Sequence, residues 1–331
     1  MTDKLLEIVL ETAACPLCGS GDHDPVLVAR SMDNIPGRAF QVARCKQCGL
    51  FMTNPRPVPE SMSFFYEDGL YEQGEGVMKA AINPVMKLLS SQRLRHVKRF
   101  KKRGTILDIG CGKGKFLKAA ARDGWETWGV ESSQRSLSLS EKGAGVRILN
   151  SRFENADLPD DAFDVITMWH TLEHFYEPRE ILNKAGQKLK NDGVLFVRVP
   201  NCHSWDYSLG KEKWFQLDVP RHLYHFSPET LSAFLDHAGF KLLHVSTSSL
   251  EDNFMSTLQT VMADAGFPPG SIFRVIKGFG QERGPVKMLK TATVAITAAV
   301  LALPSVIITE AAVAAGRGGT ITAVAVKKEA A

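Results

Sequence analysis

The chain has 331 residues, of which 44% are hydrophobic and 23% are charged, and its formal net charge is +4. These values are close to those of average soluble globular proteins, and they exclude a wholly disordered chain and a polytopic membrane protein. The length accommodates one large domain with one or two small appendages. The first residues, MTDKLLEIVL, carry acids within a short apolar stretch, so we expect no secretory signal and a cytoplasmic location.

The first feature along the chain is a pair of cysteine motifs. Cys15 and Cys18 flank Pro-Leu, Cys45 and Cys48 flank Lys-Gln, and a glycine follows each motif. Two such motifs can direct four thiolates to one zinc ion, and such a tetrahedral site leaves no coordination position open for catalysis. The 26 intervening residues exceed the common spacing of about 15 to 20, so we expect an additional hairpin or loop. We predict a structural zinc ribbon, with two redox-active pairs as the alternative.

A proline-rich run, NPRPVPE, marks the end of this zinc-binding module, which we place at residues 1–56. We expect residues 57–104 to form a helical, basic connector, because no acid occurs between Gly76 and Leu107. The basic side chains at its end are Arg93, Arg95, Lys98, Arg99, Lys101, Lys102 and Arg103. A solvated helix face explains this run most simply, and a nucleic-acid-binding surface is the alternative.

Seven short, β-branched runs follow, and helix-like stretches separate most of them. The runs are TILDI, TWGVE, VRIL, DVITMW, VLFVRV, LLHVST and TITAVAV. This alternation predicts an α/β fold with a Rossmann-like sheet of parallel strands and helices at residues 115–122 and 178–190. The seventh run follows a long helical stretch and a Gly-Arg-Gly-Gly turn, which suits a reversed last strand. We place the core at residues 105–251, a helical insertion at 252–317 and the final strand at 318–331.

Three alternating glycines lie directly after the first strand. Gly110, Gly112 and Gly114 follow Asp108 in the run DIGCGKG, and the next residues begin a helix. Glycine permits a tight turn and lets a ligand approach the backbone closely. The spacing differs from the Gly-x-Gly-x-x-Gly of pyrophosphate-binding loops, so an adenosyl cofactor without phosphates is favoured. Glu131 ends the second strand 21 residues after Gly110, where a carboxylate can accept hydrogen bonds from both ribose hydroxyls.

These motifs together resemble those of the class I S-adenosylmethionine-dependent methyltransferases. The similarity includes DIGCGKG, the acid after strand two, DLPDDAFDVITMWHTLEHFYEP and LKNDGVLFVRVPN, over about residues 105–250 and the last strand. It implies a seven-stranded sheet with a reversed last strand, and S-adenosylmethionine bound over the carboxyl ends of strands one, two and four. By this resemblance Asp108 and the glycines hold the methionine part, and Glu131 holds the ribose.

Two further comparisons belong to this resemblance. The family often shows an acid after strand three that contacts adenine, whereas this chain has Asn-Ser-Arg-Phe-Glu there, so the adenine contacts stay open. The cysteine motifs, the PRP run and FFYEDGLYEQG are similar to the N-terminal part of sugar C-methyltransferases and many bacterial methyltransferases. That similarity does not fix the acceptor.

Two histidine-containing segments follow strands four and five. We expect His170 to line the cofactor pocket, because ligands of open α/β sheets bind at the carboxyl ends of strands. His170 also begins a His-x-x-Glu-His string, which we interpret as accidental because the zinc-protease motif requires a long helix. His222 lies in a polar, aromatic loop before the helix that starts near Ser227. Since imidazole suits proton removal near neutral pH, we assign catalytic roles to His222 and His170, with packing as the alternative for His222.

An apolar stretch of 19 residues without charge lies between Lys290 and Glu310. Its length approaches that of a transmembrane helix. Pro304 interrupts it, however, and the final strand must return to the same sheet as strand six, so we expect a buried or interfacial helix. Peripheral membrane contact through residues 286–316 is an alternative that the sequence leaves open.

The residues and the resemblance lead to one functional hypothesis. We expect methyl transfer from S-adenosylmethionine to a small-molecule acceptor, such as a sugar nucleotide, a lipid-linked intermediate or another metabolite. The alternatives are RNA methylation, suggested by the basic run and the zinc motifs, and a non-catalytic zinc-containing scaffold. The modest net charge argues against a nucleic-acid partner, and the intact glycine loop with Glu131 argues against a scaffold.

Overall fold

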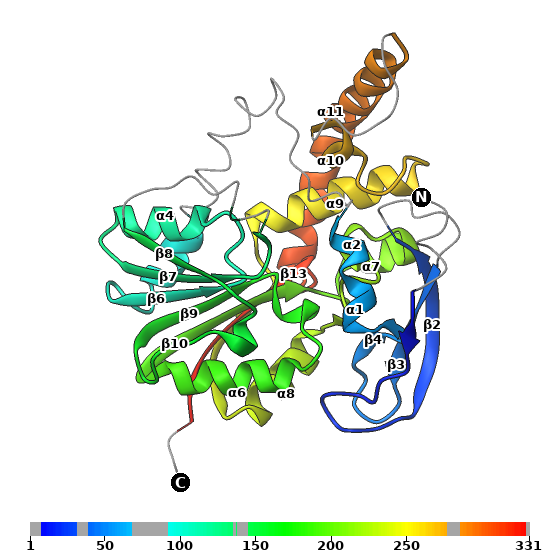
Figure 1. The fold of residues 1–331 in the computed structure, drawn as a ribbon. Coiled ribbons are helices and arrows are strands. Elements are labelled where there is room, and N and C mark those ends of the chain that lie inside the picture. The colour runs from blue at the N-terminus through cyan, green and yellow to red at the C-terminus, as the bar shows by residue number, and fades with distance from the viewer. Residues whose placement is uncertain are drawn as a thin grey trace. The chain divides into compact units, whose positions relative to one another are not determined.

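A computed structural model of the chain describes residues 8–31, 39–67, 92–134, 137, 145–276 and 285–328 (Figure 1). The chain divides into two compact units, each assembled from segments that are distant in sequence. The sheet unit comprises residues 83–199, 228–246 and 321–331, and the cysteine unit comprises residues 1–82, 200–227 and 247–320. Much of the connector expected at residues 57–104 lies outside the described residues, and the domain boundaries expected from the sequence stay predictions.

The sheet unit is built around a seven-stranded sheet. Its strands, in spatial order, are β12 (Phe240–Ser246), β13 (Thr320–Lys327), β10 (Leu189–Pro200), β9 (Phe163–Trp169), β6 (Thr105–Ile109), β7 (Glu126–Glu131) and β8 (Val146–Asn150). Strands β6 to β10 pair in parallel, whereas β13 pairs antiparallel with β12. The seven expected strands are therefore present, and the Rossmann-like α/β fold with a reversed last strand is confirmed.

Helices cover both faces of this sheet. Helix α4 (Lys115–Arg122) lies on one side, and α6 (Pro178–Lys188) and α8 (Pro228–His237) lie on the other (Figure 1). On the α4 side, Phe116 and Phe196 belong to a buried cluster that also includes side chains of the helical segment 92–98. Because both faces are covered, most side chains of β6, β9 and β10 are apolar and buried. Among the buried polar residues of the parallel strands, Asp108 and Thr167 lie opposite each other and mark the candidate site.

The helix starts follow the sequence, but one helix end does not. Pro178 and Pro228 are the first residues of α6 and α8, where the fixed φ of proline suits the first turn. The helix expected to reach Lys190 ends at Lys188, and residues 189–193 belong to β10. The pairing of β10 with β9 shifts register between Leu189 and Val194, which lets a strand accommodate turn-forming residues.

The cysteine unit contains a four-stranded antiparallel sheet. In spatial order its strands are β11 (Tyr224–His225), β4 (Phe51–Thr53), β3 (Ala39–Cys45) and β2 (His23–Arg30). A separate pair joins β1 (Leu10–Glu11) to β5 (Arg56–Pro57). The antiparallel pair β2 and β3 fills the interval between the two cysteine motifs, so the additional hairpin expected there is confirmed. Strand β11 shows that the loop after β10 pairs with the N-terminal module.

Six α-helices are described in the cysteine unit. They are α1 (Pro59–Met62), α2 (Phe64–Glu67), α7 (Trp205–Gly210), α9 (Leu250–Asp264), α10 (Ser271–Ile276) and α11 (Pro285–Ala314). Helix α9 contacts α7, α10 and α11. In the most apolar 18-residue window of Met288–Ala314 only 6% is buried, so a buried C-terminal helix is wrong, whereas the interfacial helix expected as its alternative stays a prediction. In the described part of the chain, this helix alone is long and apolar enough to cross a membrane.

Candidate active site and metal centre

The glycine loop begins where β6 ends, at the carboxyl edge of the sheet. Gly110 has a φ of 72°, and its N–H donates to the carbonyl oxygen of Val130 at 2.9 Å. A Cβ atom at Gly110 would lie 2.5 Å from Cγ2 of Thr171. A side chain here would therefore collide with the segment that follows β9, so this position requires glycine.

The next two glycines shape the entry to helix α4. Gly112 and Gly114 have φ values of 53° and 68°, in the left-handed region that favours glycine. Gly114 is the residue before α4, and a Cβ atom there would lie 3.1 Å from Cδ1 of Ile148. A Cβ atom at Gly112, by contrast, would meet no atom within 4 Å. The backbone of Gly112 therefore borders open space that a ligand can occupy.

The structure brings Glu131 to this loop. Oε2 of Glu131 accepts a hydrogen bond from the N–H of Gly112 at 2.8 Å, and Oε1 accepts one from the N–H of Ser133 at 2.7 Å. Two backbone donors thus hold the carboxylate at the end of β7. Each carboxylate oxygen can accept more than one hydrogen bond, so Glu131 keeps capacity for ribose hydroxyls.

Asp108 lies one strand away from Glu131, in the buried part of β6. Its side chain is 3% exposed, and Oδ1 accepts a hydrogen bond from Oγ1 of Thr167 at 2.7 Å. Burial raises the pKa of Asp108 to about 7, although the Thr167 bond and the Arg93 guanidinium oppose this rise. A buried carboxyl that titrates near neutral pH at the edge of a sheet is typical of a functional site.

Two supporting residues of this site were not predicted. Thr167 faces Asp108 directly in the pairing of β9 with β6, and Thr171 packs against Gly110. The sequence did contain a signal for Thr167, because it is the polar residue within the apolar run VITMW, which pairs with β6 so that Thr167 lies opposite Asp108. No comparable signal identifies Thr171, whose role depends on the path of the chain after β9.

His170 lies directly after β9, as predicted. Its φ of 55° places a non-glycine residue in the left-handed region, and its N–H donates to the carbonyl oxygen of Arg198 at 2.8 Å. Nδ1 of His170 lies 3.5 Å from Oε1 of Glu173, whose side chain is fully buried. Backbone strain of this kind clusters at functional sites. The neighbouring Thr171 contacts the glycine loop, whereas the catalytic role of His170 stays a prediction.

His222 belongs to the cysteine unit and is 6% exposed. Nδ1 lies 2.9 Å from the carbonyl oxygen of Gln216, and Nε2 lies 3.8 Å from Oδ2 of Asp218. Asp218 also forms a buried, two-pronged ion pair with Arg221, whose Nη1 donates to the carbonyl oxygen of Phe65 at 3.1 Å. The loop around His222 is therefore held by buried polar contacts. The catalytic role of His222 stays a prediction.

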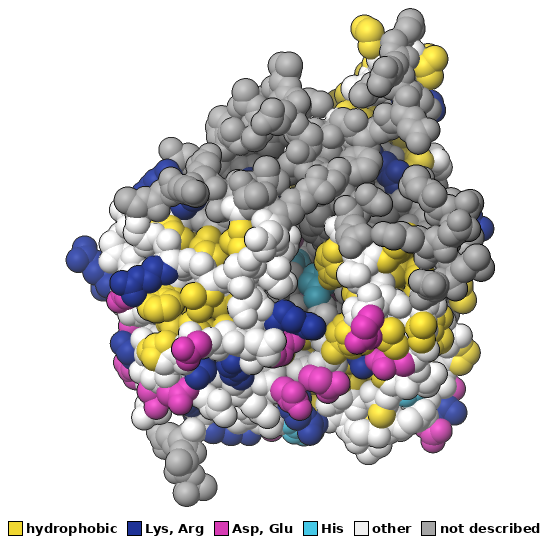
Figure 2. Space-filling view, viewed as in Figure 1, with side chains coloured by type: hydrophobic (Ala, Val, Ile, Leu, Met, Phe, Trp, Pro, Cys, Tyr) yellow, Lys and Arg dark blue, Asp and Glu magenta, His cyan; other side chains and the backbone are white. Residues whose placement is uncertain are grey.

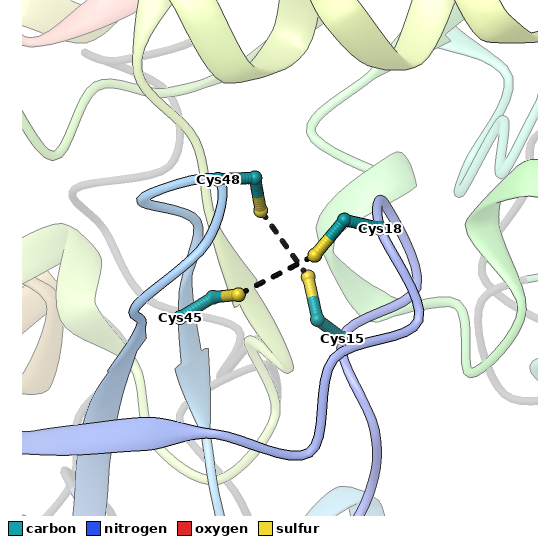
Figure 3. Close-up of side chains that lie close together, drawn as sticks. All are labelled: Cys15, Cys18, Cys45 and Cys48. Atoms are coloured by element: carbon teal, nitrogen blue, oxygen red, sulfur yellow. Dashed lines mark hydrogen bonds between the residues drawn. The ribbon is translucent and has the colours of Figure 1, made fainter.

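The four cysteines of the two motifs converge (Figure 3). The Sγ atoms of Cys15 and Cys48 are 3.4 Å apart, those of Cys18 and Cys45 are 3.5 Å apart, and all four lie within 4.8 Å of one another. Zinc–sulfur bonds of about 2.3 Å place the sulfurs of a tetrahedral site roughly 3.8 Å apart, so the cluster fits zinc. Each of these close pairs joins one motif to the other, whereas a redox-active motif pairs its own two cysteines.

The two cysteine motifs have the same turn geometry. Gly19 donates its N–H to the carbonyl oxygen of Cys15 at 2.8 Å, and Gly49 donates to that of Cys45 at 2.9 Å. Burial raises the pKa of Cys15 to about 11, whereas for Cys45 backbone N–H groups outweigh burial and lower the pKa to about 7. Several buried thiolates require a cation nearby to be stable together, which this donor set would receive from zinc.

Comparison with known proteins agrees with this geometry. Residues 83–245 match the family model described as a methyltransferase domain. The ubiquinone biosynthesis O-methyltransferase of Coxiella burnetii is 28% identical over 153 residues, which cover 43% of this chain and 65% of that protein. The mitochondrial ubiquinone biosynthesis O-methyltransferase of Schizosaccharomyces pombe is 35% identical over 100 residues, which cover 28% of this chain and 36% of that protein. The chain thus spans less than two thirds of the length of these curated relatives.

Solved structures of methyltransferases are also similar to this chain. Phosphoethanolamine N-methyltransferase 2 of Haemonchus contortus, in complex with S-adenosyl-L-methionine, has a TM-score of 0.48 and 18% identity, over 72% of this chain and 53% of that chain. An S-adenosylmethionine-dependent methyltransferase from Archaeoglobus fulgidus has a TM-score of 0.44 and 20% identity, over 73% of this chain and 94% of that chain. The family match places a methyltransferase domain at residues 83–245, and the strand order, the glycine loop and the bond from Gly112 to Glu131 agree with that match.

Proposed function

We propose that the chain is an enzyme that transfers the methyl group of S-adenosylmethionine to a small-molecule acceptor. The observation that carries this proposal is the hydrogen bond from Gly112 to Glu131, which joins the glycine loop to the acid at one edge of the sheet. The acceptor classes that we consider are a sugar nucleotide, a lipid-linked intermediate or another metabolite. The relatives named ubiquinone biosynthesis O-methyltransferases support an acceptor of small size.

Each site residue has a role in this proposal. Glu131 accepts hydrogen bonds from the ribose hydroxyls, Asp108 faces the methionine part, and Gly112 leaves room for the cofactor. S-adenosylmethionine supplies an electrophilic methyl group when bound, so the protein has to position the acceptor and, for a hydroxyl or an amine, remove a proton. His222 and His170 are the candidate bases.

We further propose that the four cysteines of the two motifs hold one structural zinc ion. Four thiolates fill a tetrahedral site, so no position is left for a substrate or a reactive water. The ion would fasten the turn before β2 to the turn after β3. This role concerns the folding of the cysteine unit and not the methyl transfer itself.

RNA is a weaker candidate acceptor, because three of the seven basic side chains of the run contact other residues of their own domain. Lys98 lies 2.9 Å from a carboxylate oxygen of Asp123, Lys101 forms an ion pair with Asp192, and the guanidinium of Arg93 lies 5.4 Å from the ring centroid of Trp169. Charges that are paired within the domain contribute less to the field that attracts a phosphate backbone.

A labelling experiment tests the proposed function. The purified protein is incubated with S-adenosylmethionine labelled in its methyl group and with fractionated cell extracts. We expect labelled product of low molecular mass that resists ribonuclease and protease. Label that is released by ribonuclease would assign the protein to RNA methylation. If calorimetry shows no binding of S-adenosylmethionine, the protein would instead be a non-catalytic zinc-containing scaffold.

A further inference from the structure

Helix α11 carries most of the exposed large hydrophobic side chains of the described chain. Fifteen such side chains are exposed, and eight of them lie on this helix. The eight are Val286, Met288, Leu289, Ile296, Val300, Leu303, Val306 and Ile307, with exposed fractions of 42 to 74%. Figure 1 shows that α11 extends well past α9, and Figure 2 shows hydrophobic side chains on the extended end. A contiguous apolar surface of this kind marks a site of interaction.

The exposed side chains form a stripe along one side of the helix. Leu289, Ile296, Val300, Leu303 and Ile307 are separated by seven, four, three and four residues, the spacing of a single helix face. At about 1.5 Å per residue, this stripe is about 27 Å long. We refer to these five residues as the α11 stripe.

The side of the helix away from the stripe packs within the protein. Ser305, Thr309 and Ala312 are buried, and Oγ1 of Thr309 donates to Oγ1 of Thr257 on α9 at 3.0 Å. This contact fixes which side of α11 faces outward. The packing of α11 against α9 therefore fixes the orientation of the helix about its axis and keeps the stripe exposed.

The surroundings of the stripe are compatible with lipid, because the nearby polar group is hydrogen-bonded within the helix and the segment carries no charge. Thr293, which lies near the stripe, donates its hydroxyl to the carbonyl oxygen of Leu289 at 2.9 Å, so this polar atom is satisfied within the helix. No charged residue occurs from 291 to 309. Lys290 lies about 110° around the helix from the centre of the stripe, where a long side chain can extend to lipid headgroups.

The topology excludes a transmembrane span. The segment from residue 247 to 319 leaves the sheet at the end of β12 and returns to it at β13, and these strands pair with each other. A single crossing would separate the paired strands by a bilayer, and α11 is the one helix in the described residues that could cross. The helix can therefore only lie within one face of a membrane.

We propose that the α11 stripe inserts into one leaflet of a phospholipid bilayer and holds the protein at the membrane surface. A partner protein or a second copy is a less suitable occupant, because the stripe has no aromatic or arginine anchor and no polar donor for the hydrogen bonds that protein interfaces contain. This proposal does not depend on the proposed methyl transfer. It would, however, give the enzyme direct access to acceptors that partition into lipid.

Vesicle flotation tests this proposal on the full-length protein. Vesicles of phosphatidylcholine and phosphatidylglycerol are mixed with the protein and centrifuged through a sucrose gradient. We expect the wild type to float with the vesicles. For the variant Ile296→Asp/Val300→Asp we expect a floated fraction at least tenfold smaller than that of the wild type, because a charge in the apolar layer is costly. The control Val28→Asp/Leu243→Asp adds the same charge at exposed sites outside α11 and should float like the wild type.

Further measurements separate the competing outcomes. Binding of S-adenosylmethionine by the stripe variant, at wild-type affinity, would show that the variant is folded and that the methyltransferase domain works independently of the stripe. Tryptophan fluorescence of Val300→Trp should be quenched by lipids brominated in the acyl chains. A wild type that fails to float would overturn the proposal. The proposal would also be overturned if light scattering showed that the wild type is a dimer and the stripe variant a monomer, and the wild type did not float.

Discussion

The backbone N–H of Gly112 donates a hydrogen bond of 2.8 Å to Oε2 of Glu131. Gly112 follows β6 and Glu131 is the last residue of β7, and these two strands are neighbours in the parallel sheet. The bond orients the carboxylate in the protein itself, so the site needs little rearrangement when it receives a ligand. It also means that the conformation of the glycine loop and the position of the acid depend on each other.

Substitution of Gly112 tests the assignment of the cofactor site. We expect Gly112→Val to lower the affinity for S-adenosylmethionine at least tenfold, because the side chain would enter the open space beside the loop and strain a residue with a φ of 53°. Isothermal titration calorimetry measures this affinity directly.

Gly239 offers a matched control for the strain. It has a φ of 80°, and a Cβ atom there would also meet no atom within 4 Å, but it lies in the turn between α8 and β12. Gly239→Val should therefore lose a similar amount of stability and keep wild-type affinity for the cofactor. Equal affinities in both variants would mean that Gly112 does not border the cofactor.

The sheet was predictable because its signals are local. Apolar runs, the alternating glycines and proline at the first turn of a helix act over a few residues, and each of these elements lies where it was expected. Glu131 could be predicted for the same reason, since it ends a strand at a fixed distance from the loop. The helix expected to extend to Lys190 ends two residues earlier because Leu189 already pairs with Phe163 of β9, a contact between distant segments that no local pattern indicates.

Other features depend on contacts between distant segments, which one sequence does not contain. The pairing of β11 with β4 joins residues separated by more than half of the chain, and no local pattern indicates it. The exposure of α11 is a similar case. An apolar helix has the same composition whether it packs in a core or faces outward, and only the arrangement around it decides between the two.

The zinc site predicts a defined metal content. We expect one zinc per chain in the purified protein and a loss of zinc in Cys45→Ser, because three thiolates bind zinc more weakly than four. Cys45→Ser should also lower the stability of the cysteine unit, since binding of the metal contributes to folding. Elemental analysis by mass spectrometry gives the stoichiometry, and Cys202→Ser, at a buried cysteine outside the cluster, should keep one zinc. Wild-type protein without zinc would refute the site.

Asp108 predicts a change of stability with pH. The pKa of its carboxyl rises from 3.8 to about 7 on folding, so the folded protein binds more protons than the unfolded chain between these values. The contribution of Asp108 to stability therefore falls as pH rises from about 4 to 7 and stays constant above that range. We subtract the melting temperature of the wild type from that of Asp108→Asn, both without cofactor. We expect this difference to increase from pH 5 to pH 8.

An exposed aspartate provides the comparison for this experiment. Lys101 holds the pKa of Asp192 below its usual value of 3.8, so this carboxyl is ionised throughout the range from pH 5 to 8. Asp192→Asn should consequently show a constant difference in melting temperature from the wild type over the same range. A constant difference for Asp108→Asn as well would show that its carboxyl does not titrate near neutral pH.

His222 predicts a selective loss of turnover. Its Nδ1 lies 2.9 Å from the carbonyl oxygen of Gln216, so the neutral ring donates from Nδ1 and carries its basic lone pair on Nε2. If Nε2 removes a proton from the acceptor, His222→Asn should lower kcat by about 10² or more while leaving the affinity for S-adenosylmethionine nearly unchanged. An acceptor that already presents a lone pair or a stabilised carbanion would give a smaller loss, so the size of the effect reports on the acceptor chemistry.

His225 lies in the same loop and separates catalysis from packing. It is buried like His222, and its Nε2 lies 3.4 Å from Oγ1 of Thr53 in the sheet of the cysteine unit. His225→Asn should therefore reduce the melting temperature with a proportionate, modest effect on kcat. For His222→Asn we expect the larger loss of kcat, together with loss of the limb of the pH–rate profile that reports deprotonation of a base. If both variants lose stability and turnover in parallel, with unchanged pH profiles, His222 is a packing residue and the proton acceptor must be sought elsewhere, first at His170.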